Sequence, residues 1–116
     1  MASRANIKII GFNATAYLYK HHDGYPNGLG NDLKQFIAEH GYFSYNYYPF
    51  MYKLLKTYPN IEETNSIHGD ISYLYEIDLI NKTIKCFQCN YEYGDFPNYT
   101  RTYNKIELWV KRIQKL

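Results

Sequence analysis

The segment DISYLYEIDLI, residues 70–80, carries the clearest structural pattern of the chain. From residue 71 to residue 79 its odd-numbered side chains are aliphatic or tyrosine, and those between them are Ser72, Leu74, Glu76 and Asp78. Successive side chains of an extended strand point to opposite faces, so this alternation predicts a long strand with one buried face. Asn81 and Lys82 form a short connection to a second strand at residues 83–93, which predicts a hairpin.

Upstream, the chain predicts another hairpin and two helices. Residues 7–12 and 15–20 are strand-like, with Asn13 as a turn residue between them. From residue 31, apolar side chains recur at helical spacing until Gly41, which predicts a helix that ends there. Residues 47–58 predict a second helix, with Pro49 in its first turn.

The remaining segments are less regular. Residues 60–69 are polar and rich in turn residues, which predicts a surface loop. The spacing of Ile106, Trp109 and Ile113 suits a helix, whereas Ile106, Leu108 and Val110 also suit a strand; we favour the helix. The predicted order is β-β-α-α-β-β-α. Residues 1–116 should therefore form one α+β domain, with an antiparallel sheet of two β-hairpins packed against two or three helices.

Composition excludes several classes of protein. With 116 residues, 46% of them hydrophobic, and a formal net charge of +2, the chain is too apolar and too weakly charged for intrinsic disorder. Its one dense basic cluster lies at the C-terminus, so nucleic acid is not an expected partner. No run of 18 apolar residues and no signal-peptide core occurs. We expect a cytoplasmic protein without membrane contact, in the host cytoplasm if a phage encodes it.

The segment HHDGYPNGLGND, residues 21–32, links the first hairpin to the first helix and is the candidate site. Its Asp-Gly and Pro-Asn-Gly turns also fit a purely structural connection. Two imidazoles, a carboxylate and a phenol nevertheless fall within five residues, beside glycines whose N–H groups could bind an anion where the helix begins. The predicted ligand-binding residues are His21, His22, Asp23, Tyr25, Gly28 and Gly30.

This loop follows the pattern His-x-Asp-Gly-Tyr-Pro-x-Gly-x-Gly, with Asp32 and Leu33 opening the helix behind it. In this pattern the chain resembles a family of small, uncharacterised proteins from tailed phages, prophages and bacteria. Residues 70–78 fit a later strand of the same family, so the likeness covers about a fifth of the chain. The resemblance implies a phage or prophage accessory protein, for example one that counters host defence, and it assigns no activity. The family loop has an aromatic residue where this chain has His22.

Metal and catalytic sites are not predicted. Cys86 and Cys89 have the spacing of a zinc corner, but residues three apart in a strand point to opposite faces. We therefore expect free thiols, no metal and no cofactor. Outside the loop, no Ser, Cys or Thr is placed beside a base by spacing, so no catalytic residue is assigned. The alternative is a small phosphoester hydrolase that uses His21 as acid or base, with Asp23 orienting it.

Aromatic side chains suggest a partner. The chain has 15 Tyr residues. Those within residues 42–52, together with Phe50, exceed what one helical face can bury, which favours a homo-oligomer, first of all a dimer, or a platform on which flat rings stack. We expect a non-enzymatic binding protein that captures a small, anionic, nucleotide-like ligand or a host protein.

Overall fold

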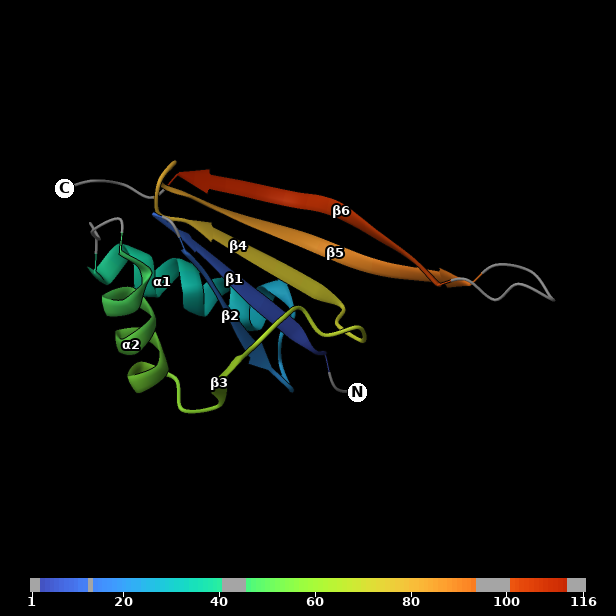
Figure 1. The fold of residues 1–116 in the computed structure, drawn as a ribbon, viewed down its shortest axis with the longest axis horizontal. Helices are drawn as coiled ribbons and strands as arrows, with labels where there is room; N and C mark the ends of the chain where they lie inside the picture. The colour runs from blue at the N-terminus through green and yellow to red at the C-terminus, as the bar shows by residue number, and fades with distance from the viewer. Residues whose placement is uncertain (1–2, 13, 41–45, 94–100, 113–116) are drawn as a thin grey trace.

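The computed structural model describes residues 3–12, 14–40, 46–93 and 101–112 (Figure 1). The strands are β1 (Ala5–Gly11), β2 (Ala14–Lys20), β3 (Ile61–Thr64), β4 (Tyr73–Asp78), β5 (Thr83–Tyr93) and β6 (Arg101–Arg112). The helices are α1 (Asn31–His40) and α2 (Tyr47–Thr57), and a π-helical turn, η1 (Pro26–Gly30), precedes α1. Neither helix is long and apolar enough to cross a bilayer. The chain is a compact α+β fold.

The strands form one six-stranded sheet in the order β3-β2-β1-β4-β5-β6. Four of its strand pairs are antiparallel, whereas β1 and β4 run parallel in the middle of the sheet. The prediction of an antiparallel sheet is therefore wrong in this respect. Between β2 and β4 the chain passes through both helices and β3, and a connection of that length allows a strand to return parallel to its neighbour.

Both helices pack on one face of the sheet, as the alternating pattern predicts (Figure 1). Leu33, Phe36 and Ile37 of α1 are buried there, together with Phe50, Met51 and Leu54 of α2. From the sheet, this cluster includes odd-numbered residues of β1 and β4 and even-numbered residues of β2 and β5. These buried apolar side chains supply the main driving force for folding.

The opposite face carries a second, smaller cluster. Tyr19, Leu74, Phe87 and Cys89 of the sheet pack with Ile71 and with the partly buried Ile67. Ile67 and Ile71 come from the segment between β3 and β4, so this segment lies against that face of the sheet. The buried Asn6 side chain fixes the segment, because its Oδ1 accepts a bond of 2.7 Å from the His68 backbone N–H. Its Nδ2 donates to the Leu18 carbonyl at 2.8 Å, so both of its polar atoms have partners.

Two elements differ from the sequence prediction. Residues 101–112 are strand β6, so the third helix is wrong and the described chain has two α-helices. A bulge explains the misleading pattern: Glu107 faces Phe87 and Trp109 faces Cys86, which leaves Leu108 as an extra residue. Within the predicted loop of residues 60–69, Ile61–Thr64 pairs with β2 as β3. Four residues are too few to show a clear strand period.

Candidate functional site

The predicted site loop, residues 21–30, is fixed to the rest of the protein through its backbone. The Gly24 N–H donates to the Ser3 carbonyl at 2.7 Å, and the Gly24 carbonyl accepts from the Tyr75 hydroxyl at 2.7 Å. The Leu29 side chain is buried, and its N–H donates to the Asp23 carbonyl at 3.2 Å. The loop is thus tied to β4, to residue 3 and to the core beneath α1, which holds its shape without a ligand.

The glycine N–H groups predicted to receive an anion already have partners within the chain. The Gly28 N–H donates to the Tyr25 carbonyl at 2.9 Å, and the Gly30 N–H donates to the same oxygen at 3.5 Å. Gly30 is itself buried. The N–H groups of Gly28 and Gly30 therefore hold the shape of the loop in this structure.

Close packing explains the glycine at position 24. A Cβ atom there would lie 2.6 Å from both the Ala5 Cβ and the Ser3 carbonyl oxygen. At Gly28 it would lie 2.8 Å from the Asp23 carbonyl oxygen, whereas at Gly30 its nearest neighbour, the Tyr75 ring, would be 3.4 Å away. Asp23 is the one non-glycine residue of this loop with a positive φ, 58°, a conformation that Asp and Asn tolerate better than most side chains.

Four of the predicted side chains are exposed to solvent: His21, His22, Asp23 and Tyr25. The ring of His22 stands edge-on to that of His21, with centroids 4.5 Å apart. The hydroxyl of Tyr19 hydrogen-bonds the His21 Nδ1 at 2.9 Å. Across the described residues, no hydrogen bond or ion pair joins Asp23 to His21. The structure thus brings the two imidazoles together and assigns the orientation of His21 to Tyr19, not to Asp23.

The structure adds a histidine that local sequence reasoning did not connect with the loop. The His68 ring stacks on that of Tyr19, with centroids 3.9 Å apart and an interplanar angle of 19°. The His68 Nε2 hydrogen-bonds the Thr64 hydroxyl at 3.0 Å. His21, His22 and His68, three of the four histidines, are therefore linked in a row through Tyr19. We call His21, His22, His68 and Tyr19 the ring row.

Charged groups near Tyr19 influence the ring row. Arg4 Nη1 lies 3.0 Å from Asp70 Oδ2. Burial is the main cause that raises the pKa of Tyr19 above its usual value, and the negative charges of Asp70 and Glu62 raise it further, while Arg4 opposes them. Tyr19 thus stays protonated at neutral pH and keeps a hydroxyl proton for its bond with His21. Its phenol is a neutral anchor for the exposed imidazoles.

The two thiols lie on opposite faces of the sheet, as predicted. Cys86 is buried in the cluster under the helices, and Cys89 in the smaller cluster on the other face. Burial raises the pKa of Cys86 to about 11, so this thiol is neutral at pH 7. Nowhere in the described chain do three His, Cys, Asp or Glu side chains gather in a way that could hold a metal ion.

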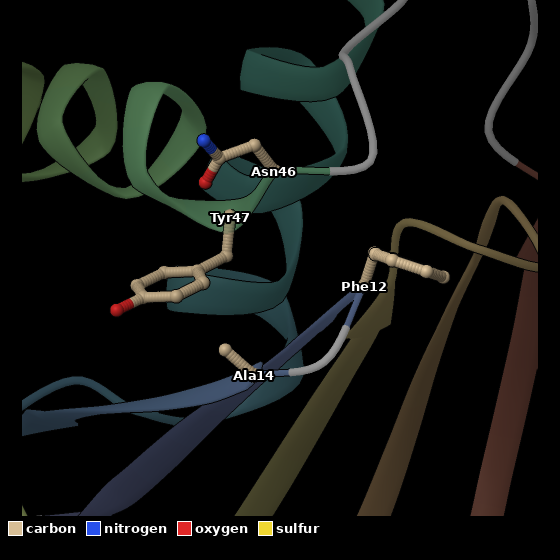
Figure 2. Close-up of a pocket in the computed structure, with 4 residues that line it drawn as sticks. All are labelled: Phe12, Ala14, Asn46 and Tyr47. Carbon is tan, nitrogen blue, oxygen red and sulfur yellow. The ribbon is translucent and has the colours of Figure 1, made fainter.

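A separate hollow of about 440 Å³ lies at the far end of the first hairpin (Figure 2). Phe12, Ala14, Asn46 and Tyr47 line it. Because Ala14 begins β2 and the site loop follows the end of β2, the hollow and the ring row lie at opposite ends of that strand. Asn46 is occupied as the N-cap of α2, with its Oδ1 accepting from the Tyr48 N–H at 3.1 Å. The described lining of the hollow is mostly apolar.

The predicted aromatic surplus is partly accounted for by packing. Phe50 is fully buried and Tyr47 packs against the core. Tyr48 and Tyr52 are 57% and 53% exposed, and their rings stack with centroids 6.3 Å apart. Tyr42 and Tyr45 lie outside the described residues. Two tyrosines of α2 thus remain as an exposed aromatic pair.

Comparison of the chain with known protein families, with curated proteins and with solved structures gave no match.

Proposed function

We propose that the protein is a non-enzymatic binding module whose ligand contacts His21, His22 and Tyr25. One observation carries this proposal. Backbone groups of the loop hydrogen-bond within the chain and hold its shape, while these three ring-bearing side chains are exposed. A rigid loop loses little conformational entropy when a ligand binds, so exposed side chains on it are suited to recognition.

The side chains favour a small ligand that combines a flat ring with an anionic group. Imidazoles donate hydrogen bonds and can carry a positive charge, which suits a phosphate. Aromatic faces stack on nucleobases whatever their sequence. The edge-on pair of His21 and His22, 4.5 Å apart, offers both contacts within one ligand's reach. A nucleotide-like molecule is therefore the first candidate.

The hydrogen-bond partner of His21 favours ligand capture over catalysis. A hydrolase mechanism would need Asp23 to orient His21, and the partner of the His21 Nδ1 is the Tyr19 hydroxyl. Asp23 instead occupies the positive-φ position of the turn, where its backbone carbonyl receives the Leu29 N–H. A buried phenol with a raised pKa is a poor acceptor of a proton at neutral pH. The geometry thus supplies an imidazole anchored by Tyr19 and not oriented by Asp23.

Calorimetric titration with inorganic phosphate, mononucleotides, cyclic nucleotides and dinucleotides tests the proposal. We expect one class to bind and His22→Ala to weaken it tenfold or more, about 1.4 kcal/mol. His40→Ala is the matched control, because His40 lies at the end of α1 against Phe36 and away from the loop. Recovery of unchanged nucleotide after denaturation would indicate capture. A new product would indicate turnover and contradict the proposal, as would the absence of binding by every compound.

A host protein is the second candidate, and the exposed pair on α2 favours it. Tyr48 and Tyr52 stack on the solvent side of the helix, and the Lys56 Nζ lies 5.4 Å above the Tyr52 ring. Exposed tyrosines beside a cation are common anchors of protein interfaces. The resemblance to phage proteins would place either form of capture in an infected cell, where the protein would serve as an accessory, for example against host defence. Loss of protein capture in a Tyr48→Ser, Tyr52→Ser variant, with nucleotide binding retained, would separate the two candidates.

A further inference from the structure

The two edges of the sheet are unlike each other. At one edge, β3 has only four residues, and the exposed side chains of Glu62 and Glu63 stand on it. Short edge strands with charged side chains are the usual protection against pairing with another chain. At the other edge, β6 has 12 residues and a length of about 40 Å. This second edge is not short, although the charged side chains of Lys105 and Glu107 are exposed on it.

Strand β6 offers unpaired backbone groups and apolar side chains. Within the described chain, β5 is its only partner in the sheet. Leu108 and Val110 are 42% and 48% exposed along it. A long edge strand of this kind presents a row of free N–H and C=O groups, which is a template for another strand. The bulge at Leu108 interrupts this row without shortening it.

Part of β6 also lacks a third strand. The pairing of β4 with β5 ends at Tyr73 opposite Gln88, whereas β5 and β6 continue from Asn90 opposite Asn104 to Tyr93 opposite Arg101. This two-stranded arm projects beyond the rest of the sheet (Figure 1). A two-stranded ribbon is marginally stable by itself in water, so a further strand beside it would be favourable.

We propose that β6 pairs antiparallel with β6 of a second copy of this chain. In such a pair a two-fold axis stands normal to the sheet, and opposed residues must share a face, so one residue lies opposite itself. Lys105 and Glu107 share the face without helices, since Lys105 contacts Glu76 and Phe87 there and Glu107 is opposite Phe87. Both side chains are exposed.

Among the registers centred on residues 105, 106 and 107, charge favours the one centred on Ile106. Centring the pair on Ile106 places Lys105 opposite Glu107 of the second copy, and the symmetry repeats this contact. Centring it on Lys105 or on Glu107 would place like charges opposite each other, which is destabilising. The Ile106 register also brings the projecting arm of each copy against the second half of the other copy's β6. Each arm thereby gains its third strand, and the two sheets become one.

Two charge reversals test this pairing, measured by light scattering and sedimentation over a range of concentrations. We expect the wild type to reach twice the chain mass of 13.9 kDa. Glu107→Lys and Lys105→Glu each place like charges across the axis twice, so each should raise the dimer Kd tenfold or more. Mixing the two variants makes every opposed pair complementary again and should restore the dimer. Circular dichroism checks the fold of Lys105→Glu, which also loses its 3.0 Å ion pair with Glu76.

Matched controls distinguish this edge from other surfaces. Glu63→Lys on β3 makes the same charge change at the opposite edge and should leave the dimer intact. A wild type that stays monomeric at every concentration, or a dimer that survives both reversals, would overturn the pairing. A dimer lost only on Tyr48→Ser with Tyr52→Ser would overturn it in favour of α2. Nucleotide titration of the wild type fails or succeeds independently, because the loop follows β2, and three strands lie between β2 and β6 in the sheet.

Discussion

The imidazole of His68 stacks on the phenol ring of Tyr19, with centroids 3.9 Å apart, although 49 positions separate them in the sequence. This contact joins the segment between β3 and β4 to the strand that leads into the site loop. Tyr19 in turn hydrogen-bonds His21, so the stack supports the exposed imidazoles from below. The stability of the segment between β3 and β4 is therefore coupled to the geometry of the site loop through Tyr19.

Replacing His68 should test that coupling. His68→Ala removes the stacked ring and the 3.0 Å bond to Thr64, while the backbone bond to Asn6 can persist. We expect a loss of about 1–2 kcal/mol of unfolding free energy in urea titrations. His68→Phe keeps a stacked ring and should recover about half of that loss. An Ala variant as stable as the wild type would mean that the stack adds nothing to the fold.

Two glycines of the loop should respond to alanine with opposite signs. Gly24→Ala brings a Cβ within 2.6 Å of Ala5 Cβ and of the Ser3 carbonyl oxygen, so the backbone must move; we expect a loss of about 2–4 kcal/mol. Gly30→Ala meets its nearest neighbour, Tyr75, at 3.4 Å, which is ordinary contact. There, reduced entropy of the unfolded chain should leave stability unchanged or raise it by about 0.5 kcal/mol. Thermal unfolding of both variants gives the comparison. Equal losses at the two positions would contradict the packing argument.

The sequence predicts the parts of this fold that local patterns encode. Alternation identified β4 and its buried face, and the three-residue spacing separated the thiols of Cys86 and Cys89 correctly. It failed at β6, because the bulge at Leu108 moves Trp109 onto the face of Cys86 and so imitates a helical spacing. The parallel pairing of β1 with β4 joins segments on either side of both helices, which no local period reports.

For the candidate site too, the sequence indicates residue types but not long-range contacts. The predicted residues His21, His22 and Tyr25 have exposed side chains, so they stay candidates for ligand contact. For Gly28 and Gly30 the sequence does not show that the Tyr25 carbonyl receives both N–H groups. His68 was missed as a neighbour, since its place depends on the buried Asn6 side chain, a contact across 62 positions. The one signal for it is the polar Asn6 between the apolar Ala5 and Ile7 of β1.

Alkaline pH should destabilise the protein through Cys86. Burial raises the pKa of this thiol from its ordinary value of 9.0 to about 11, so the unfolded chain loses its proton first as pH rises. The neutral thiol therefore favours the folded state below pH 9, and this contribution declines between about pH 9 and pH 11 by up to about 3 kcal/mol. Burial raises the pKa of Tyr75 in the same direction.

Urea unfolding at several pH values between 8 and 11 measures this decline. Cys86→Ala removes the titrating group, so it should be less stable at pH 8 because of the lost packing, yet its stability should fall less steeply with pH. The difference between the two slopes reports the Cys86 thiol together with its effect on Tyr75, whose pKa Cys86 helps to raise. Identical slopes would show that the thiol does not contribute.

Variants of the adjacent residues His22 and Asp23 should distinguish ligand recognition from turn formation. Asp23 adopts φ 58°, and among the described residues it accepts no hydrogen bond from His21, so we assign it to the turn. Asp23→Asn should then leave both melting temperature and nucleotide affinity unchanged, because Asn adopts the same conformation and makes the same local bonds. Asp23→Val should lose about 1–2 kcal/mol of stability, since a β-branched side chain is strained there. His22→Ala should show the reverse, with a melting temperature within a few degrees of the wild type and affinity reduced tenfold or more. Calorimetry and thermal unfolding of the same samples give both quantities. If Asp23→Asn abolished binding at unchanged stability, the carboxylate would belong to the ligand site, and a turn role alone would be wrong.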